Sequence, residues 1–222
     1  MSGTSDSALS KIVRHWKMSR ARTEIVTAKG FRLSEYLHLL TTDIVQRVPE
    51  FSHLKPDQML FSVTRARKRS QYGLQARVTP MRFRDGSLTK RIRNTTYQVQ
   101  RYFVEKTEIL YLVTFCVPRF LDQSFSEKLI TIFHELYHIS PDFNGDLRRM
   151  EGRYELHTHS KEGYDDQMAL LVQAYLATKP SLELLNPLRL NSNEFRQRYA
   201  GVLGYCIPQP KMLPVRDLQV TA

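Results

Sequence analysis

Residues 124–138 read SFSEKLITIFHELYH, and this stretch decides the fold of the chain. Ser124 is followed three positions later by Glu127, which is the pattern of a capping box at the start of a helix. Four apolar residues then recur at helical spacing on one face: Leu129, Ile132, Phe133 and Leu136. The stretch therefore predicts an amphipathic helix whose apolar face packs on a core.

The end of this helix carries the pattern His-Glu-x-x-His, formed by His134, Glu135 and His138. Residues four apart on a helix lie only about 40° apart around its axis, so both imidazoles can bind one ion. Glu135 lies about 100° from His134, where its carboxylate can reach a metal-bound water without binding the metal. We therefore expect one zinc ion per chain, with Glu135 as the general base.

A third zinc ligand is expected downstream, because a catalytic zinc site has three protein ligands and one open position. Residues 153–159 read RYELHTH and offer His157 and His159. Alternate residues of an extended segment point the same way, so geometry does not separate the two. We favour His159, since it directly precedes Ser160, the predicted cap of the next helix, and keep His157 as the alternative. Two carboxylates are weaker candidates, Glu155 and Asp165.

Further residues near this pattern can contact a substrate or a transition state. Tyr164 can stabilise an oxyanion through its hydroxyl, and Arg153, Arg148 and Arg149 can do so or anchor a substrate carboxylate. The alternative for Tyr164 is simple packing. The alternative for the arginines is a salt bridge to a nearby acid, namely Asp142, Asp146 or Glu151.

The rest of the chain predicts an α+β fold, with a small mixed or antiparallel sheet packed between helices. Helical patterns cover residues 31–48, 161–178 and 192–203, and strand-like runs cover residues 59–67, 73–82 and 97–117. The last run is long enough for two strands joined through residues 105–107. We divide the chain into three parts: a basic, partly disordered extension (1–30), a domain that contains the His-Glu-x-x-His helix (31–206) and an irregular tail (207–222).

Composition excludes several classes of protein. Of the 222 residues, 41% are hydrophobic and 25% charged, as in ordinary globular proteins, and no apolar stretch is long enough to span a membrane. The first thirty residues lack the apolar core of a secretory signal, so we expect a cytoplasmic protein. Two cysteines are too few for a four-cysteine zinc site, and we expect Cys116 and Cys206 to be buried free thiols.

The net charge of +11 is unevenly distributed, because residues 55–101 contain 12 basic and only 2 acidic residues. Such a cluster attracts polyanions, and aromatic residues within it (Tyr72, Phe83 and Tyr97) can stack on bases. The candidate contacts to DNA or RNA are basic residues of this cluster: Arg65, Arg67, Lys68, Arg69, Lys90, Arg91 and Arg93. The alternative is that they form a solvated strand face.

The helix and its exit resemble a known group of proteins. His134 to Ile139, followed by residues 143–149 (FNGDLRR), resemble metallopeptidases of phages and bacteria that carry a His-Glu-Leu-x-His-Ile helix, an Asp/Asn-Gly turn and arginines. More distantly, His159, Tyr164 and Met168 resemble the third histidine, aromatic residue and methionine of SprT-like proteases. The gap from His138 to the third histidine is longer here, and the zinc ribbon of many SprT-like proteins is missing.

The resemblance covers about residues 121–171 and implies a zincin fold, in which helices back a mixed sheet, and zinc-dependent hydrolysis of a protein or peptide substrate. Two other hypotheses remain: a nucleic-acid-binding protein with a structural zinc site, and a DNA-associated protease of the SprT-like kind. Closed structural zinc sites usually have four protein ligands, so an open position on the metal distinguishes the enzyme from the binding protein.

Overall fold

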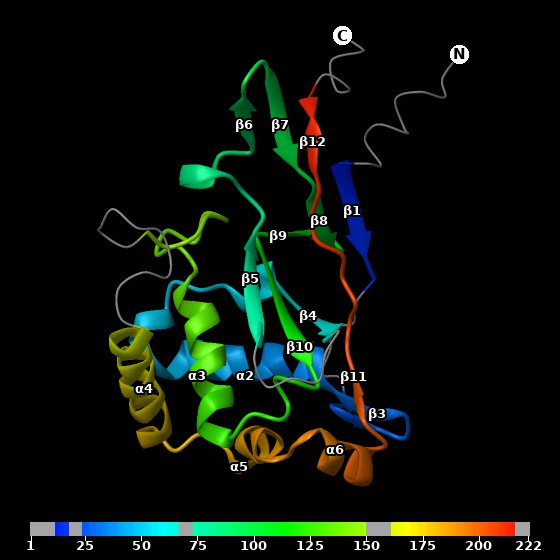
Figure 1. Cartoon of the computed structure of the whole chain (residues 1–222), viewed down its shortest axis with the longest axis vertical. Helices are drawn as coiled ribbons and strands as arrows, with labels where there is room; N and C mark the ends of the chain where they lie inside the picture. The colour runs from blue at the N-terminus through cyan, green and yellow to red at the C-terminus, as the bar shows by residue number, and fades with distance from the viewer. Residues whose placement is uncertain (1–11, 18–23, 67–72, 150–160, 216–222) are drawn as a thin grey trace.

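The computed structural model describes residues 12–17, 24–66, 73–149 and 161–215, without the side chains of residues 161–165. Its centre is a three-stranded sheet in the order β4-β10-β5 (Figure 1). Strand β10 (Tyr111–Val117) pairs in parallel with β4 (Met59–Arg65) and antiparallel with β5 (Ala76–Pro80). All but the last residue of β10 are buried, as is typical of a central strand.

The strands of this sheet divide their side chains between two cores, because successive residues of a strand face opposite sides. Tyr111, Val113 and Phe115 of β10 join the larger core, whereas Leu112 joins the smaller one. The helices of the larger core are α2 (Leu33–Arg47), α3 (Phe125–Tyr137) and α4 (Lys161–Ala177). Helix α2 packs on β4, α3 packs on β5, and α4 packs on α3. The sheet is therefore backed by helices on one face.

Three small sheets complete the described part of the chain. The first contains β1 (Val13–Trp16), β8 (Arg101–Val104) and β9 (Thr107–Ile109), and the second contains β2 (Val26–Thr27), β3 (Gly30–Arg32) and β11 (Val202–Leu203). The third contains β6 (Thr89–Ile92), β7 (Thr95–Val99) and β12 (Met212–Pro214). It stands at the opposite end of the molecule from α5 and α6 (Figure 1).

Short helical segments connect these elements. Near the C-terminus lie α5 (Leu182–Leu185), the 3-10 turn η4 (Asn186–Arg189) and α6 (Ser192–Tyr199). The other 3-10 turns are η1 (Pro49–Phe51), η2 (Pro56–Gln58) and η3 (Arg84–Gly86). Helix α6 ends four residues before the predicted limit, because Ala200 adopts the left-handed conformation with φ +58°. Within the described residues no helix is long and apolar enough to cross a membrane, and the cytoplasmic location stays a prediction.

The predicted α+β fold with a mixed sheet is confirmed, but several details differ. Residues 1–30 are not wholly an extension outside the domain, because β1 pairs with β8 and β2 pairs with β3. Residues 97–117 contain parts of four strands rather than two. The run is interrupted at Gln100, whose N–H donates to the Lys211 carbonyl, and at Glu105, where the chain turns with φ +54°. The tail is not irregular throughout, because β12 pairs with β7. Both cysteines are free, as predicted, but only Cys116 is buried and Cys206 is exposed.

Candidate metal centre

Helix α3 begins at the predicted capping box. The Ser124 hydroxyl accepts a hydrogen bond from the Glu127 backbone N–H (3.3 Å), and the Glu127 carboxylate accepts one from the Ser124 N–H (2.7 Å). These bonds satisfy two of the donors that a helix start leaves unpaired. The buried face of the helix then fixes its rotation, with Leu129 and Phe133 fully buried. The start of α3 therefore determines where its histidines point.

His134 and His138 direct their rings to one point. Their Nε2 atoms lie 2.8 Å apart, with the ring planes at 84° to each other. The two nitrogens are within hydrogen-bond distance, and tetrahedral zinc with Zn–N bonds of about 2.0–2.1 Å would hold them about 3.3 Å apart, so a small shift of the rings lets both bind one ion. The predicted pairing of these two residues is therefore present.

Glu135 is nearly buried beside this pair, with 7% of its surface exposed. Burial disfavours its charged form and raises the pKa of the carboxyl group to about 7, although a hydrogen bond from the Val78 backbone lowers that pKa in part. A carboxyl group that titrates near neutral pH suits a general base. The structure thus adds a contact between the helix and strand β5.

Strand β5 is an edge strand, and Val78 faces its outer side. The Cys116 N–H donates to the Gln75 carbonyl (2.8 Å), and the Met81 N–H donates to the Leu110 carbonyl (3.0 Å). In an antiparallel pair, hydrogen-bonded positions alternate with positions whose backbone groups point outward, so Val78 and Pro80 belong to the outward set. Pro80 has no N–H and fits this set. The edge next to Glu135 therefore offers outward backbone groups.

The chain turns back beside His138 through a loop held by Tyr111. The Tyr111 hydroxyl accepts a hydrogen bond from the Gly145 N–H (2.9 Å) and donates one to the Asp146 carbonyl (2.8 Å). Burial raises the pKa of this phenol to about 12, so it keeps its proton. The Arg148 N–H then donates to the His138 carbonyl (2.7 Å). The loop that follows α3 is therefore held by hydrogen bonds to the Tyr111 hydroxyl and to the His138 carbonyl.

The arginines of this loop have acidic partners. Arg149 pairs with Asp146 (2.8 Å), as the salt-bridge alternative predicted. Arg148 lies over the Tyr137 ring at 4.0 Å and contacts Glu50 at 3.3 Å, so its acidic partner differs from those considered. The Arg148 Nε atom is buried and has no hydrogen-bond partner among the described residues.

Several predicted site residues lie outside the described residues. These are His157, His159, Glu155, Arg153, Arg67, Lys68 and Arg69. Tyr164 and Asp165 belong to α4, but their side chains are not described. Within the described ranges no three side chains of His, Cys, Asp or Glu meet in one group. The third ligand, whether His159 or His157, therefore stays a prediction.

The sequence analysis did not identify two groups that help to position the candidate site, the Val78 N–H and the Lys128 side chain. The Lys128 side chain is 1% exposed and donates hydrogen bonds to the carbonyls of Leu188 (3.0 Å) and Leu190 (2.6 Å). It anchors the η4 turn to α3. The signal was present for Lys128, since it lies four residues before Ile132 on the buried face. No local pattern could have indicated Val78, because its contact to Glu135 is long-range.

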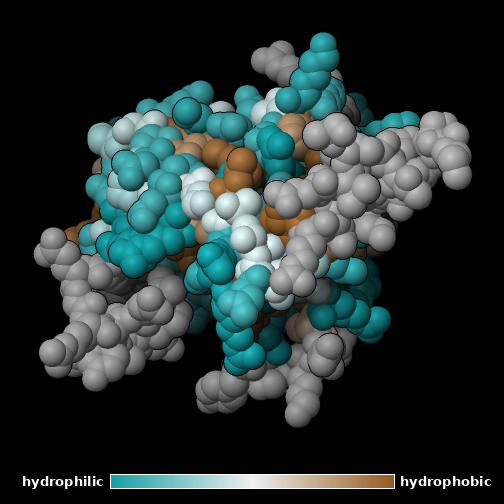
Figure 2. Space-filling view, turned by 90° about the horizontal axis from the view of Figure 1, so that it is seen from above, coloured by the Kyte–Doolittle hydropathy of each residue, from teal (hydrophilic) through white to brown (hydrophobic). Residues whose placement is uncertain are grey.

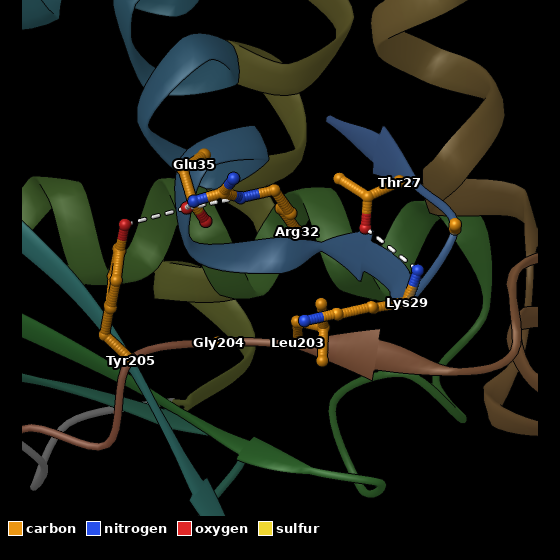
Figure 3. Close-up of a pocket in the computed structure, with 8 residues that line it drawn as sticks. Thr27, Lys29, Arg32, Glu35, Leu203, Gly204 and Tyr205 are labelled. Atoms are coloured by element: carbon orange, nitrogen blue, oxygen red, sulfur yellow. Dashed lines mark hydrogen bonds and ion pairs between the residues drawn. The ribbon is translucent and has the colours of Figure 1, made fainter. Parts of the chain in front are cut away.

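A pocket of about 400 Å³ lies elsewhere, between the start of α2 and the C-terminal chain (Figure 3). Two of its charged residues pair with each other, since Glu35 accepts a hydrogen bond from Arg32 (2.7 Å). Glu35 also accepts one from the Tyr205 hydroxyl (2.8 Å). We interpret these bonds as the tie between the C-terminal segment and α2, and assign the pocket no ligand.

The chain thus combines a mixed sheet with a helix that presents a His-Glu-x-x-His set beside the edge strand. The family described as "Putative phage metallopeptidase" matches residues 30–168, and the chain belongs to this family. The matched range includes all of α2 and α3. No curated protein and no solved structure matches the chain significantly. The more distant resemblance to SprT-like proteases stays a prediction.

Proposed function

We propose that the chain is a zinc-dependent peptide hydrolase in which Glu135 is the general base. The observation that carries this proposal is the convergence of the His134 and His138 Nε2 atoms at 2.8 Å beside a buried carboxyl group. Membership of a metallopeptidase family supports it independently.

The donor set fits zinc. Imidazole nitrogens are common zinc ligands, and His134 and His138 would hold the ion together with His159 or His157. Bound zinc lowers the pKa of water and polarises a carbonyl group. Glu135 follows His134 directly in the helix, so its carboxylate is placed to serve as base rather than as ligand.

Glu135 carries out both proton transfers. Its carboxylate accepts a proton from the attacking water while the water oxygen bonds to the carbonyl carbon of the peptide. It then gives the proton to the leaving nitrogen as the C–N bond breaks. The hydrogen bond from the Val78 backbone orients the Glu135 carboxyl group. The pKa of this carboxyl group, about 7, suits both the uptake and the release of a proton near neutral pH.

Strand β5 supports an extended peptide as the substrate. Outward backbone groups of an edge strand can pair with an added strand, which is a common mode of peptide recognition. The outward position Val78 is the one that contacts Glu135. The Val78 N–H already donates to Glu135, so a peptide would pair with the other outward groups of this edge and would lie next to the base.

Zinc content tests the ligand set. We expect about one zinc per wild-type chain by elemental analysis, and loss of zinc in His134→Ala and His138→Ala. Of the variants His159→Ala and His157→Ala, we expect one to lose the metal, and that variant identifies the third ligand. His15→Ala is the matched control, since His15 is exposed in β1 and stacks on Phe103. Absence of zinc from the wild type after zinc loading would contradict the proposal.

A further inference from the structure

The third small sheet forms an arm, which we define as residues 89–99 and 212–214. Strands β6 and β7 pair from Thr89↔Gln98 to Ile92↔Thr95, with a turn at Arg93 and Asn94. Strand β12 covers only the inner half of β7, because it ends opposite Tyr97. Within the described residues the outer part of the arm is thus a two-stranded ribbon that stands out at one end of the molecule (Figure 1).

The charge of the arm differs from that of the rest of the basic cluster. In the body, Arg82 and Arg101 both contact Glu108 at 2.6 Å, so one of their two positive charges is compensated. On the arm, Lys90, Arg91 and Arg93 are exposed and make no ion pair with a described residue. The ribbon therefore carries three positive charges within four residues, and none of them has an acidic partner among the described residues.

Arg93 occupies a backbone position that disfavours it. Its φ of +53° lies in the left-handed region, where hairpin turns favour glycine or asparagine. An arginine here adds strain to the turn and contributes a charged side chain at its tip.

The shape and chemistry of the arm favour duplex DNA among polyanions. The major groove of B-DNA is about 12 Å wide and admits a two-stranded β-ribbon. Lys90, Arg91 and Arg93 can contact the phosphates that border the groove, and asparagine, present at the tip as Asn94, is a side chain that bonds to adenine edges. Figure 2, which looks onto this end of the molecule, shows mostly hydrophilic described surface around smaller hydrophobic areas.

An anionic membrane fits less well, because membrane-binding hairpins and helices insert apolar and aromatic residues. The tip here reads Ile92-Arg93-Asn94-Thr95, with a single apolar residue that is 39% exposed. We propose that the β6–β7 ribbon binds duplex DNA in the major groove through Lys90, Arg91 and Arg93.

The test is the salt dependence of binding by the full-length, zinc-loaded chain to a short labelled DNA duplex, measured by fluorescence anisotropy. The arm variant carries Lys90→Gln, Arg91→Gln and Arg93→Gln. The control variant carries Lys106→Gln, Lys179→Gln and Arg196→Gln, which remove the same charge from exposed positions on other elements. Each lost phosphate contact reduces the slope of log K against log salt by about 0.9, so we expect a reduction of about 2.7 in the arm variant only.

Equal slopes in the wild type and the arm variant, or equal reductions in both variants, would overturn the proposal. Arg93→Gly separates binding from folding, because glycine relieves the strained φ and the variant should be at least as stable as the wild type while its slope falls by about 0.9. Vesicles of phosphatidylserine provide the second probe. Loss of vesicle binding with unchanged duplex binding in the arm variant would assign the arm to membranes and overturn the proposal.

Discussion

Lys128 is a single residue that helps to position α3, the helix that carries His134 and His138. Its ammonium group is buried between α3 and the η4 turn, where two backbone carbonyls accept its hydrogen bonds. Burial lowers the pKa of this lysine to about 8, because the charged form loses its hydration. The folded protein therefore carries a cost for holding this lysine protonated at neutral pH.

This cost predicts an unusual pH dependence of stability. Below pH 8 the lysine is protonated in both states, and the folded state carries the full cost. Between about pH 8 and 10.5 the unfolded state binds more protons, so the free energy of unfolding rises with pH. The rise is at most about 3 kcal/mol, from about 1.4 kcal/mol per pKa unit. Chemical denaturation of the wild type and Lys128→Met across this range measures it, and parallel pH profiles would contradict it.

Among the secondary-structure elements, strand β5 connects the fold to the proposed chemistry. Its hydrogen-bonded positions hold it to β10, and its outward positions face Glu135 and the proposed substrate. This alternation predicts that proline at an outward position of β5 mainly lowers peptide hydrolysis, whereas proline at the neighbouring hydrogen-bonded position mainly lowers the stability of the fold.

Val78→Pro removes an outward N–H and some packing against the larger core, so we expect a smaller loss of unfolding free energy than in Thr79→Pro and a fall in peptide hydrolysis of about 10- to 100-fold. That range corresponds to one hydrogen bond to a charged group, about 1.5–3 kcal/mol. Thr79→Pro is the control, because the Thr79 N–H serves the ladder to Leu112 and its loss should destabilise the fold. Denaturation and a peptidase assay on both variants test this, and full activity of Val78→Pro would show that its N–H has no role.

Elements differ in how well the sequence predicts them. Helices α2, α3 and α4 were predicted, because a repeat of about 3.6 residues is a local signal. Strand β12 was missed because Pro208, Pro210 and Pro214 indicate an irregular tail, and its pairing with β7 is more than a hundred residues away in the chain. Proline is compatible with an edge strand, so Pro214 did not exclude a strand.

At the scale of the whole molecule, the proposed catalytic site and the proposed DNA-binding arm belong to different elements. The site lies on α3 beside β5, and the arm is built from β6, β7 and β12. Net charge alone predicted an attraction to polyanions but not where it would act. In the fold, Glu108 compensates one of the two charges of Arg82 and Arg101, whereas Lys90, Arg91 and Arg93 have no acidic partner among the described residues. Likewise, the His-Glu-x-x-His spacing predicted the two converging histidines, whereas the burial of Glu135 required the fold.

The most direct test of the central claim is peptide hydrolysis by Glu135→Gln at a zinc content matched to that of the wild type. The amide cannot accept the proton of the attacking water, but the ligands stay intact. We therefore expect equal zinc and a loss of hydrolysis of about 10²- to 10⁴-fold, measured on an unfolded fluorogenic protein substrate. Hydrolysis at the wild-type rate would show that Glu135 is not the base, and loss of zinc together with activity would make it a ligand; either result would contradict the account.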